Sequence, residues 1–147
     1  MMAGTSSIDV RKAAMADVRG AALVYQAAFN ERVKPRTIAS KIDNPEFIVG
    51  VAEGRCVVLG FVLIAKSRDP AKFNVHYVCA HPIDAPKGTG RALMFWAEAE
   101  AVVAGATHIR LAVRRDNSKA RSFYAGLGYA VLEARDAGYT LIKKVSR

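Results

Sequence analysis

The sequence lacks several features that would place it in a secreted or membrane class. Its 147 residues include only two cysteines, Cys56 and Cys79, both in apolar runs typical of strands, so a disulfide framework is not indicated. The polar start, Met1–Ser7, has no apolar stretch like that of a secretory signal. No apolar run reaches the roughly 18 residues of a membrane span. We expect one domain over residues 1–147, disordered at 1–7, in a reducing cytoplasm.

Acidic residues are also scarce relative to basic ones. The chain has 22 Lys and Arg against 13 Asp and Glu, a formal charge of +9. An excess of positive charge raises the local concentration of anionic partners, such as nucleic acid, acidic protein or a polyphosphate cofactor. Several basic residues lie near the motifs described below: Lys87, Arg91, Arg110, Arg114, Arg115, Lys119 and Arg121.

The hydrophobic pattern predicts alternating strands and helices, with no repeat or second domain. Strands are expected at 8–11, 47–52, 55–65, 73–80, 109–113, 129–133 and 139–145. Helices are expected at 14–29, within 30–44, at 91–104 and at 118–127. A strand, a helix and a strand between residues 73 and 113 form a right-handed crossover, so the fourth and fifth strands should be parallel.

Individual residues refine this pattern. The Glu53–Gly54 pair predicts a tight turn between the second and third strands. Gly60 interrupts the third strand, where a backbone or a bulge is expected to come close. Trp96, the only tryptophan, is expected to pack against the sheet rather than to bind a ligand. Asp17 suits the positive end of the first helix.

The most informative stretch runs from Ala80 to Met94. Pro82 ends the preceding strand because proline cannot donate to a sheet. A loop with Gly88 and Gly90 follows, and helix-forming residues begin at Arg91. Glycine permits close approach of the backbone, and the first N–H groups of a helix have no partner within it, so this arrangement can bind phosphate. A plain tight turn would also explain the two glycines alone.

Two segments carry a resemblance to a known family. Ala85-Pro-Lys-Gly-Thr-Gly90 resembles motif A of the GNAT family of N-acetyltransferases, Arg/Gln-x-x-Gly-x-Gly/Ala. Asn117-Ser-Lys-Ala-Arg-Ser-Phe-Tyr-Ala-Gly-Leu-Gly-Tyr129 resembles its motif B, Asn-x-x-Ala-x-x-x-Tyr-x-x-x-Gly-aromatic. The order and spacing of the two motifs extend the resemblance from Ile8 to about Val145.

The resemblance implies an α/β (α+β) fold and transfer of an acetyl group from acetyl-coenzyme A to a primary amine in a ternary complex. The fold has a mixed, mostly antiparallel sheet of about seven strands, with splayed parallel strands four and five, and about four helices. No metal is expected. The residues that the resemblance assigns to the cofactor are Val78, Cys79, Ala80, Ala85, Lys87, Gly88, Thr89, Gly90, Arg91, Ala92, Asn117, Lys119, Ala120 and Tyr124.

Tyr124 matches the family tyrosine that protonates the departing thiolate, and a phenol has a suitable pKa for this role. A buried tyrosine that only packs its helix is the alternative. His76, on strand four, is a candidate base at a position where many relatives have a carboxylate; a histidine without chemistry is its alternative. Ala112 stands where some protein N-terminal acetyltransferases have Glu or His. His81 and His108 are expected in loops, without a role.

The chain departs from motif A at its first two positions. Ala85 replaces Arg or Gln, and Pro86 has no N–H to offer a phosphate, although the charge of Lys87 could compensate. This departure keeps a second function open, a catalytically silent acyl-coenzyme A sensor. A third is a basic RNA- or ribosome-binding module, which lacks support because 110–121 contains no aromatic residue.

The acceptor amine cannot be named from the sequence. By resemblance, the walls of its pocket come from residues 29–45 and 133–139, and relatives are commonly homodimers.

Overall fold

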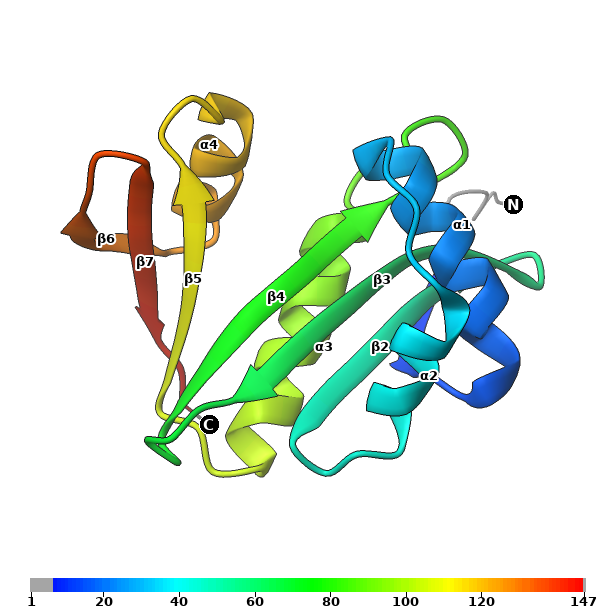
Figure 1. The fold of residues 1–147 in the computed structure, drawn as a ribbon, viewed down its shortest axis with the longest axis horizontal. Helices are drawn as coiled ribbons and strands as arrows, with labels where there is room; N and C mark the ends of the chain where they lie inside the picture. The colour runs from blue at the N-terminus through cyan, green and yellow to red at the C-terminus, as the bar shows by residue number, and fades with distance from the viewer. Residues whose placement is uncertain (1–6, 147) are drawn as a thin grey trace.

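The computed structural model describes residues 7–146, so the disorder expected at residues 1–7 lies outside the described residues except at Ser7. One seven-stranded sheet has the order β1-β2-β3-β4-β5-β7-β6 (Figure 1). Its strands are β1 (Asp9–Lys12), β2 (Phe47–Gly54), β3 (Val57–Lys66), β4 (Lys72–Ala80), β5 (His108–Arg114), β6 (Ala130–Ala134) and β7 (Gly138–Lys144). The helices are α1 (Val18–Phe29), α2 (Pro35–Ile42), α3 (Thr89–Val103) and α4 (Ser118–Gly126), with a 3₁₀ turn η1 (Met15–Asp17) before α1.

The helices cover the sheet on two sides and create two cores. Helix α3 lies on one face, and α1 and α2 lie on the other (Figure 1). Leu93, Met94 and Ala97 of α3 are fully buried in the first core, and Val24 and Ile38 of α1 and α2 are buried in the second. Strand β3 is buried from Gly60 to Ala65 because it lies between both layers. The expected seven-stranded α/β architecture with four helices is confirmed.

Close packing of α3 depends on glycines in the strands beneath it. A Cβ atom at Gly50 would lie 2.2 Å from Cζ3 of Trp96, so the indole occupies the space above that glycine. A Cβ atom at Gly60 would lie 2.9 Å from the carbonyl oxygen of Cys79. The packing role of Trp96 and the close backbone approach at Gly60 are therefore both confirmed.

The hairpin between β2 and β3 turns two residues later than predicted. Gly54 still pairs with Val57, and the turn residues are Arg55 and Cys56, with φ values of 53° and 67°. Two successive positive φ values are the signature of the type I′ hairpin turn, for which sequence rules favour glycine. The predicted turn at Glu53–Gly54 is wrong, and Cys56 is exposed at the turn rather than within a strand.

Two other boundaries also differ from the sequence prediction. The first helix begins with the separate turn η1, because the Asp17 carboxylate accepts the Ala14 N–H at 2.7 Å and a fork from Arg11 at 2.7 and 2.9 Å. Asp17 therefore anchors the start of α1 through Arg11. His108 opens β5 instead of lying in a loop, and it pairs with Lys72 and Lys144.

Strands β4 and β5 are parallel but pair only at their beginnings. Their register includes Lys72↔His108, Phe73↔Ile109 and Asn74↔Arg110, where Arg110 Nε donates to Asn74 Oδ1 at 3.2 Å. Beyond this point the strands diverge (Figure 1). Within the described residues, no strand pairs with residues 75–80 on the β5 side. We call this segment the open edge of β4; its backbone can pair with an extended ligand.

Candidate active site

The loop before α3 presents unpaired amide groups at the end of the open edge. Gly88 is the N-cap of α3 with φ 90°, a conformation that glycine adopts without strain. The N–H groups of Gly88, Gly90 and Arg91 donate to no group of residues 7–146. They lie at the positive end of the α3 dipole, so the loop can bind an anion such as a pyrophosphate.

Other polar atoms of this loop already form hydrogen bonds within the protein. The amide and hydroxyl of Thr89 both donate to the Pro86 carbonyl, at 3.2 and 2.7 Å, and the Thr89 side chain is buried. The Ala85 amide donates to the His81 carbonyl at 3.2 Å, and Pro86 has no N–H. Thr89 therefore shapes the loop, and Ala85 and Pro86 leave it with fewer available donors. His81 Nδ1 accepts the amides of the next turn, Ile83 and Asp84, which gives this histidine a local structural role.

The fold brings the two sequence motifs together. A Cβ atom at Gly90 would lie 3.4 Å from Cζ of Phe123, so the start of α3 lies against α4. Asn117 caps α4, and its Oδ1 accepts the Ala120 N–H at 3.1 Å. Motif B therefore flanks the loop that contains Gly88 and Gly90.

Most of the basic residues near the motifs are engaged within the protein. Arg115 donates to the Tyr139 hydroxyl at 3.0 Å, and the Arg115 and Arg121 guanidinium groups both lie over the Tyr139 ring. By contrast, Lys87 and Lys119 are exposed and make no hydrogen bond or ion pair with any described residue. Arg91 is also exposed, and within residues 7–146 its guanidinium contacts only the Phe95 ring, at 5.2 Å from the centroid, so Lys87, Lys119 and Arg91 are all available to bind a phosphate.

Strand β4 offers its backbone rather than its side chains to the open edge. Val78 packs toward the α3 core, and Cys79 packs into the core under α1 and α2. Burial raises the pKa of the Cys79 thiol to about 12, so it stays protonated and is no nucleophile. The His81 N–H donates to the Leu59 carbonyl of β3. Main-chain groups alternate between the two edges of a strand, so those of Val78 and Ala80 face the open edge and those of Cys79 face β3.

Tyr124 lies on α4 between two other rings. Its ring centroid is 5.1 Å from that of Phe123 and 5.7 Å from that of Tyr129. Burial, with a smaller contribution from the nearby Cys79 thiol, raises its pKa to about 12. Its hydroxyl donates to no described residue. The phenol therefore remains protonated close to β4 and has its proton available.

A β-bulge at His76 changes the side on which β4 displays its residues. Tyr77 pairs with Leu63, whereas Val75 pairs with the next residue, Ile64, so His76 is the extra residue. A bulge places two residues opposite one and redirects the following side chain. His76 and Tyr77 consequently both face α1 and α2. Strict alternation in the sequence could not predict this; the adjacent His-Tyr pair in an apolar strand was the available signal.

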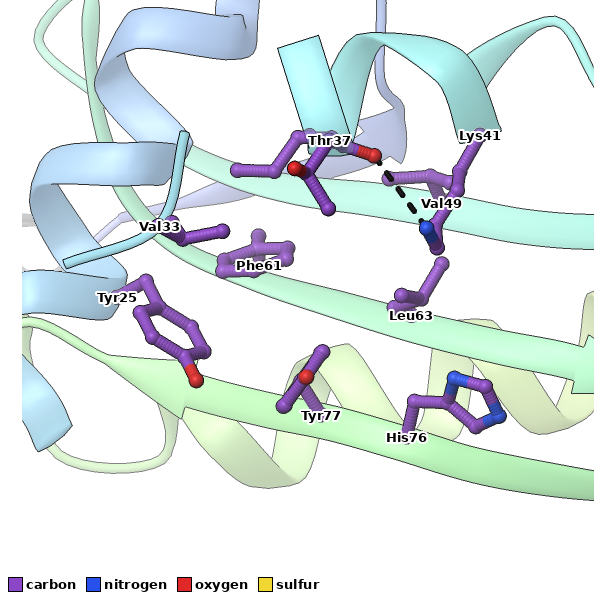
Figure 2. Close-up of a pocket in the computed structure, with 10 residues that line it drawn as sticks. Tyr25, Val33, Thr37, Lys41, Val49, Phe61, Leu63, His76 and Tyr77 are labelled. Carbon is purple, nitrogen blue, oxygen red and sulfur yellow. Dashed lines mark hydrogen bonds between the residues drawn. The ribbon is translucent and has the colours of Figure 1, made fainter. Parts of the chain in front are cut away.

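These two side chains line a cavity of about 290 Å³ beneath α1 and α2, which we call the α2 pocket (Figure 2). Tyr25 meets Tyr77 edge-on at 5.2 Å and donates to Glu31 at 3.2 Å. Burial raises the pKa of Tyr25 to about 12. The lining residues are Tyr25, Val33, Thr37, Ile38, Lys41, Val49, Phe61, Leu63, His76 and Tyr77.

The surroundings of His76 in the pocket lower the pKa of its imidazole. Burial, and then the positive charge of Lys41, lower the pKa of His76 below its ordinary value of 6.5. Neutral imidazole therefore predominates at neutral pH, which is the form that accepts a proton. The structure places the candidate base at the pocket.

The sequence missed Tyr25 and Tyr77 as pocket residues and did not single out Lys41 within the predicted wall. The expectation that residues 29–45 form a pocket wall fits Val33 to Lys41, whereas no residue of 133–139 lines the α2 pocket. Ala112 is exposed and borders a different cavity, with Tyr139 and Thr140.

The described part of the chain contains no cluster of three or more His, Cys, Asp and Glu residues that could hold a metal ion. Over the same residues, every helix is too short or too polar to cross a membrane.

Solved structures with the same fold include several acetyltransferases. PaiA N-acetyltransferase from Thermoplasma acidophilum, in complex with coenzyme A, is 21% identical, with a TM-score of 0.75 over 94% of this chain and 99% of that one. A putative acetyltransferase, YncA from Salmonella typhimurium, with acetyl-CoA, is 18% identical, with a TM-score of 0.80 over 97% and 96%. The ribosomal-protein-S18-alanine N-acetyltransferase from Escherichia coli is 18% identical, with a TM-score of 0.77 over 96% of each chain.

None of the curated proteins matches this sequence. A family model does match: residues 16–129 fit that of the acetyltransferase (GNAT) family, and this range includes both motifs, Tyr124 and the α2 pocket. The resemblance drawn from the two motifs is thereby confirmed, as is the expectation of an acyltransferase. The chain belongs to the GNAT family of acetyltransferases.

Proposed function

We propose that the protein is an N-acetyltransferase that uses acetyl-coenzyme A and binds its acceptor amine in the α2 pocket. The observation that carries this proposal is the open edge of β4, which leads to the unpaired amides of Gly88, Gly90 and Arg91. An extended pantetheine could pair with such an edge, and its pyrophosphate would meet the loop amides. PaiA in complex with coenzyme A and YncA with acetyl-CoA share this fold, which supports the same assignment.

The available groups fit a direct transfer. Acetyl-coenzyme A would supply a thioester: the amine nitrogen bonds to its carbonyl carbon, the carbon–sulfur bond breaks, and the thiolate leaves. Tyr124 would give its proton to this thiolate and regain one from solvent; its raised pKa keeps the phenol protonated until the carbon–sulfur bond breaks. An amide N–H of the open edge would stabilise the oxyanion.

His76 is our proposed base. It would accept the proton that the amine loses, directly or through water, because its lowered pKa keeps the imidazole neutral. On this proposal the cofactor approaches from the open edge and the amine from the α2 pocket.

Two measurements test the proposal. Calorimetry should show saturable binding of acetyl-coenzyme A, and a panel of primary amines should release free thiol from it. Binding without thiol release by any amine would favour the silent sensor. Absence of binding at millimolar concentration would overturn the assignment of the open edge, and preferential binding of RNA at moderate salt would favour the RNA-binding alternative.

A further inference from the structure

Lys41 is a half-buried cation at the α2 pocket. Its Nζ donates to the Thr37 carbonyl at 3.4 Å (Figure 2). It also lies 5.4 Å from the centroid of the Phe47 ring. No carboxylate of residues 7–146 forms an ion pair with it. An ammonium group has three donors, so one long bond leaves Lys41 able to bind an anion.

The rest of the pocket lining carries no compensating negative charge. No Asp or Glu belongs to it, and its polar groups are the hydroxyls of Tyr25, Tyr77 and Thr37 and the imidazole of His76. Glu31 accepts the Tyr25 hydroxyl but is exposed and outside the lining. A ligand with a second ammonium group would therefore meet Lys41 without a carboxylate to offset the repulsion.

The pocket is small and mostly apolar. Its volume of about 290 Å³ is at the lower end of ligand sites, and Phe61, Leu63 and Val49 form its floor on the sheet. Figure 2 places Tyr25 and Val33 at one end and Lys41 and His76 at the other. A fitting molecule has a compact apolar or aromatic body and an anionic group near Lys41.

We propose that the acceptor is a small primary amine with an apolar or aromatic body and a carboxylate, in the manner of a free hydrophobic amino acid, and that Lys41 binds the carboxylate. This inference rests on the proposed function, since it names the substrate class of the same site. A peptide amino-terminus lacks the free α-carboxylate and is disfavoured.

Binding of the carboxylate would also assist His76. Because the charge of Lys41 contributes to the low pKa of His76, a negative charge beside Lys41 opposes that effect and makes the imidazole a stronger base. The substrate would thus improve the base that accepts its proton.

Matched acceptors isolate the carboxylate. Phenylalanine, phenylalaninamide and 2-phenylethylamine share one aromatic body, and only the first has a carboxylate. We expect kcat/KM, expressed per unprotonated amine, to be about tenfold to a hundredfold higher for phenylalanine, as for one charge-assisted hydrogen bond. In Lys41→Met the ratio should fall to about one, while acetyl-coenzyme A affinity stays unchanged. Lys34→Met is the control, since Lys34 is an exposed lysine near α2 and outside the pocket lining.

The outcomes separate this inference from the proposed function. Equal kcat/KM for the three acceptors, or a carboxylate preference that survives in Lys41→Met, overturns the inference and leaves N-acetyltransfer intact. If no amine releases thiol, the proposed function fails, and NMR titration of the protein with the same compounds decides the inference. Preferential binding of phenylalanine that is lost in Lys41→Met then supports it, and equal or absent binding overturns it.

Discussion

The two sides of strand β4 hold the candidate site in different ways. On the β5 side the groups that we propose to bind the cofactor are backbone amides, those of the open edge and those of Gly88, Gly90 and Arg91. On the α1 and α2 side they are side chains from separate elements, including Tyr25, Lys41, His76 and Tyr77. The first side is suited to a cofactor of fixed shape, and the second can change its specificity by single substitutions.

This difference follows from how each side is built. A backbone site needs only a strand end, glycines and a helix start, all contiguous in sequence. A side-chain pocket needs residues from α1, α2, β2, β3 and β4 at one place, and it also needs the bulge that turns His76 toward it. Variants that affect only the proposed cofactor site or only the α2 pocket therefore test this difference.

The largest expected effect is on kcat, when the proposed acid Tyr124 loses its hydroxyl. Tyr124→Phe should lower kcat by about 10²–10⁴-fold, as loss of a positioned acid does, with acetyl-coenzyme A affinity unchanged. Because the pKa of Tyr124 is about 12, the wild-type rate should not fall through its ionisation up to about pH 10. Tyr139→Phe is the matched control, and it should lose only a surface hydrogen bond. The measurement is the steady-state rate of thiol release. An unimpaired rate in Tyr124→Phe would contradict the proposed role of Tyr124 as the acid.

The next effect concerns the cofactor side alone. Gly90→Val should weaken acetyl-coenzyme A binding by about tenfold to a hundredfold, because the side chain blocks approach to the loop amides. The protein should stay folded, since the first added atom lies 3.4 Å from Phe123. Gly88→Val should show the same loss and also a lower Tm, because its φ of 90° is strained for valine.

Calorimetry measures the affinities, and Gly126→Val, which points into open space, is the control for both glycine variants. Wild-type affinity in either Gly88→Val or Gly90→Val would contradict the assignment of the loop.

A smaller effect, on the free energy of unfolding, tests the contact between Asp17 and Arg11 that anchors the start of α1 on the pocket side. Asp17→Asn should lower stability by about 2 kcal/mol at neutral pH and Tm by about 4–8 °C, because the carboxylate accepts from Arg11 and Ala14. Arg11 lowers the pKa of Asp17, so its contribution is present above the ordinary value of 3.8 and is lost as the pH falls through the folded value. The two proteins should therefore converge in acid denaturation. Asp43→Asn, at an exposed aspartate, is the control, and a pH-independent difference would contradict this account.

The smallest expected effect is a displacement of a pH profile. If His76 is the base, kcat/KM should rise with pH through a value below 6.5, because burial and Lys41 lower the pKa of His76. Lys41→Met removes one of these causes, so the rise should move to higher pH, and His76→Ala should abolish it. An identical profile in wild type and His76→Ala would assign the rise to the acceptor amine.

The sequence by itself determined the parts of this protein that are contiguous in the chain. The strand, the loop with Gly88 and Gly90 and the start of α3 follow one another, so local rules predicted the anion site, and the spacing from Asn117 to Tyr124 predicted the second motif. The parallel crossover of β4 and β5 followed from strand–helix–strand order. These features depend on backbone conformation and hydrophobic periodicity, which neighbouring residues largely set.

Only the tertiary structure determined which side chains, distant in the sequence, line the same pocket. The turn at Arg55–Cys56 depends on the register of β2 with β3, and the sequence rule for glycine placed it wrongly. Lys41 and His76 are far apart in sequence and line one pocket because α2 packs against α1 and β2, while the bulge in β4 turns His76 toward the same face of the sheet. A register shift reverses which face a residue occupies, and no local preference encodes the packing that selects it. The proposed cofactor site could therefore be predicted from the sequence, whereas the pocket depends on how α1, α2 and the strands pack together.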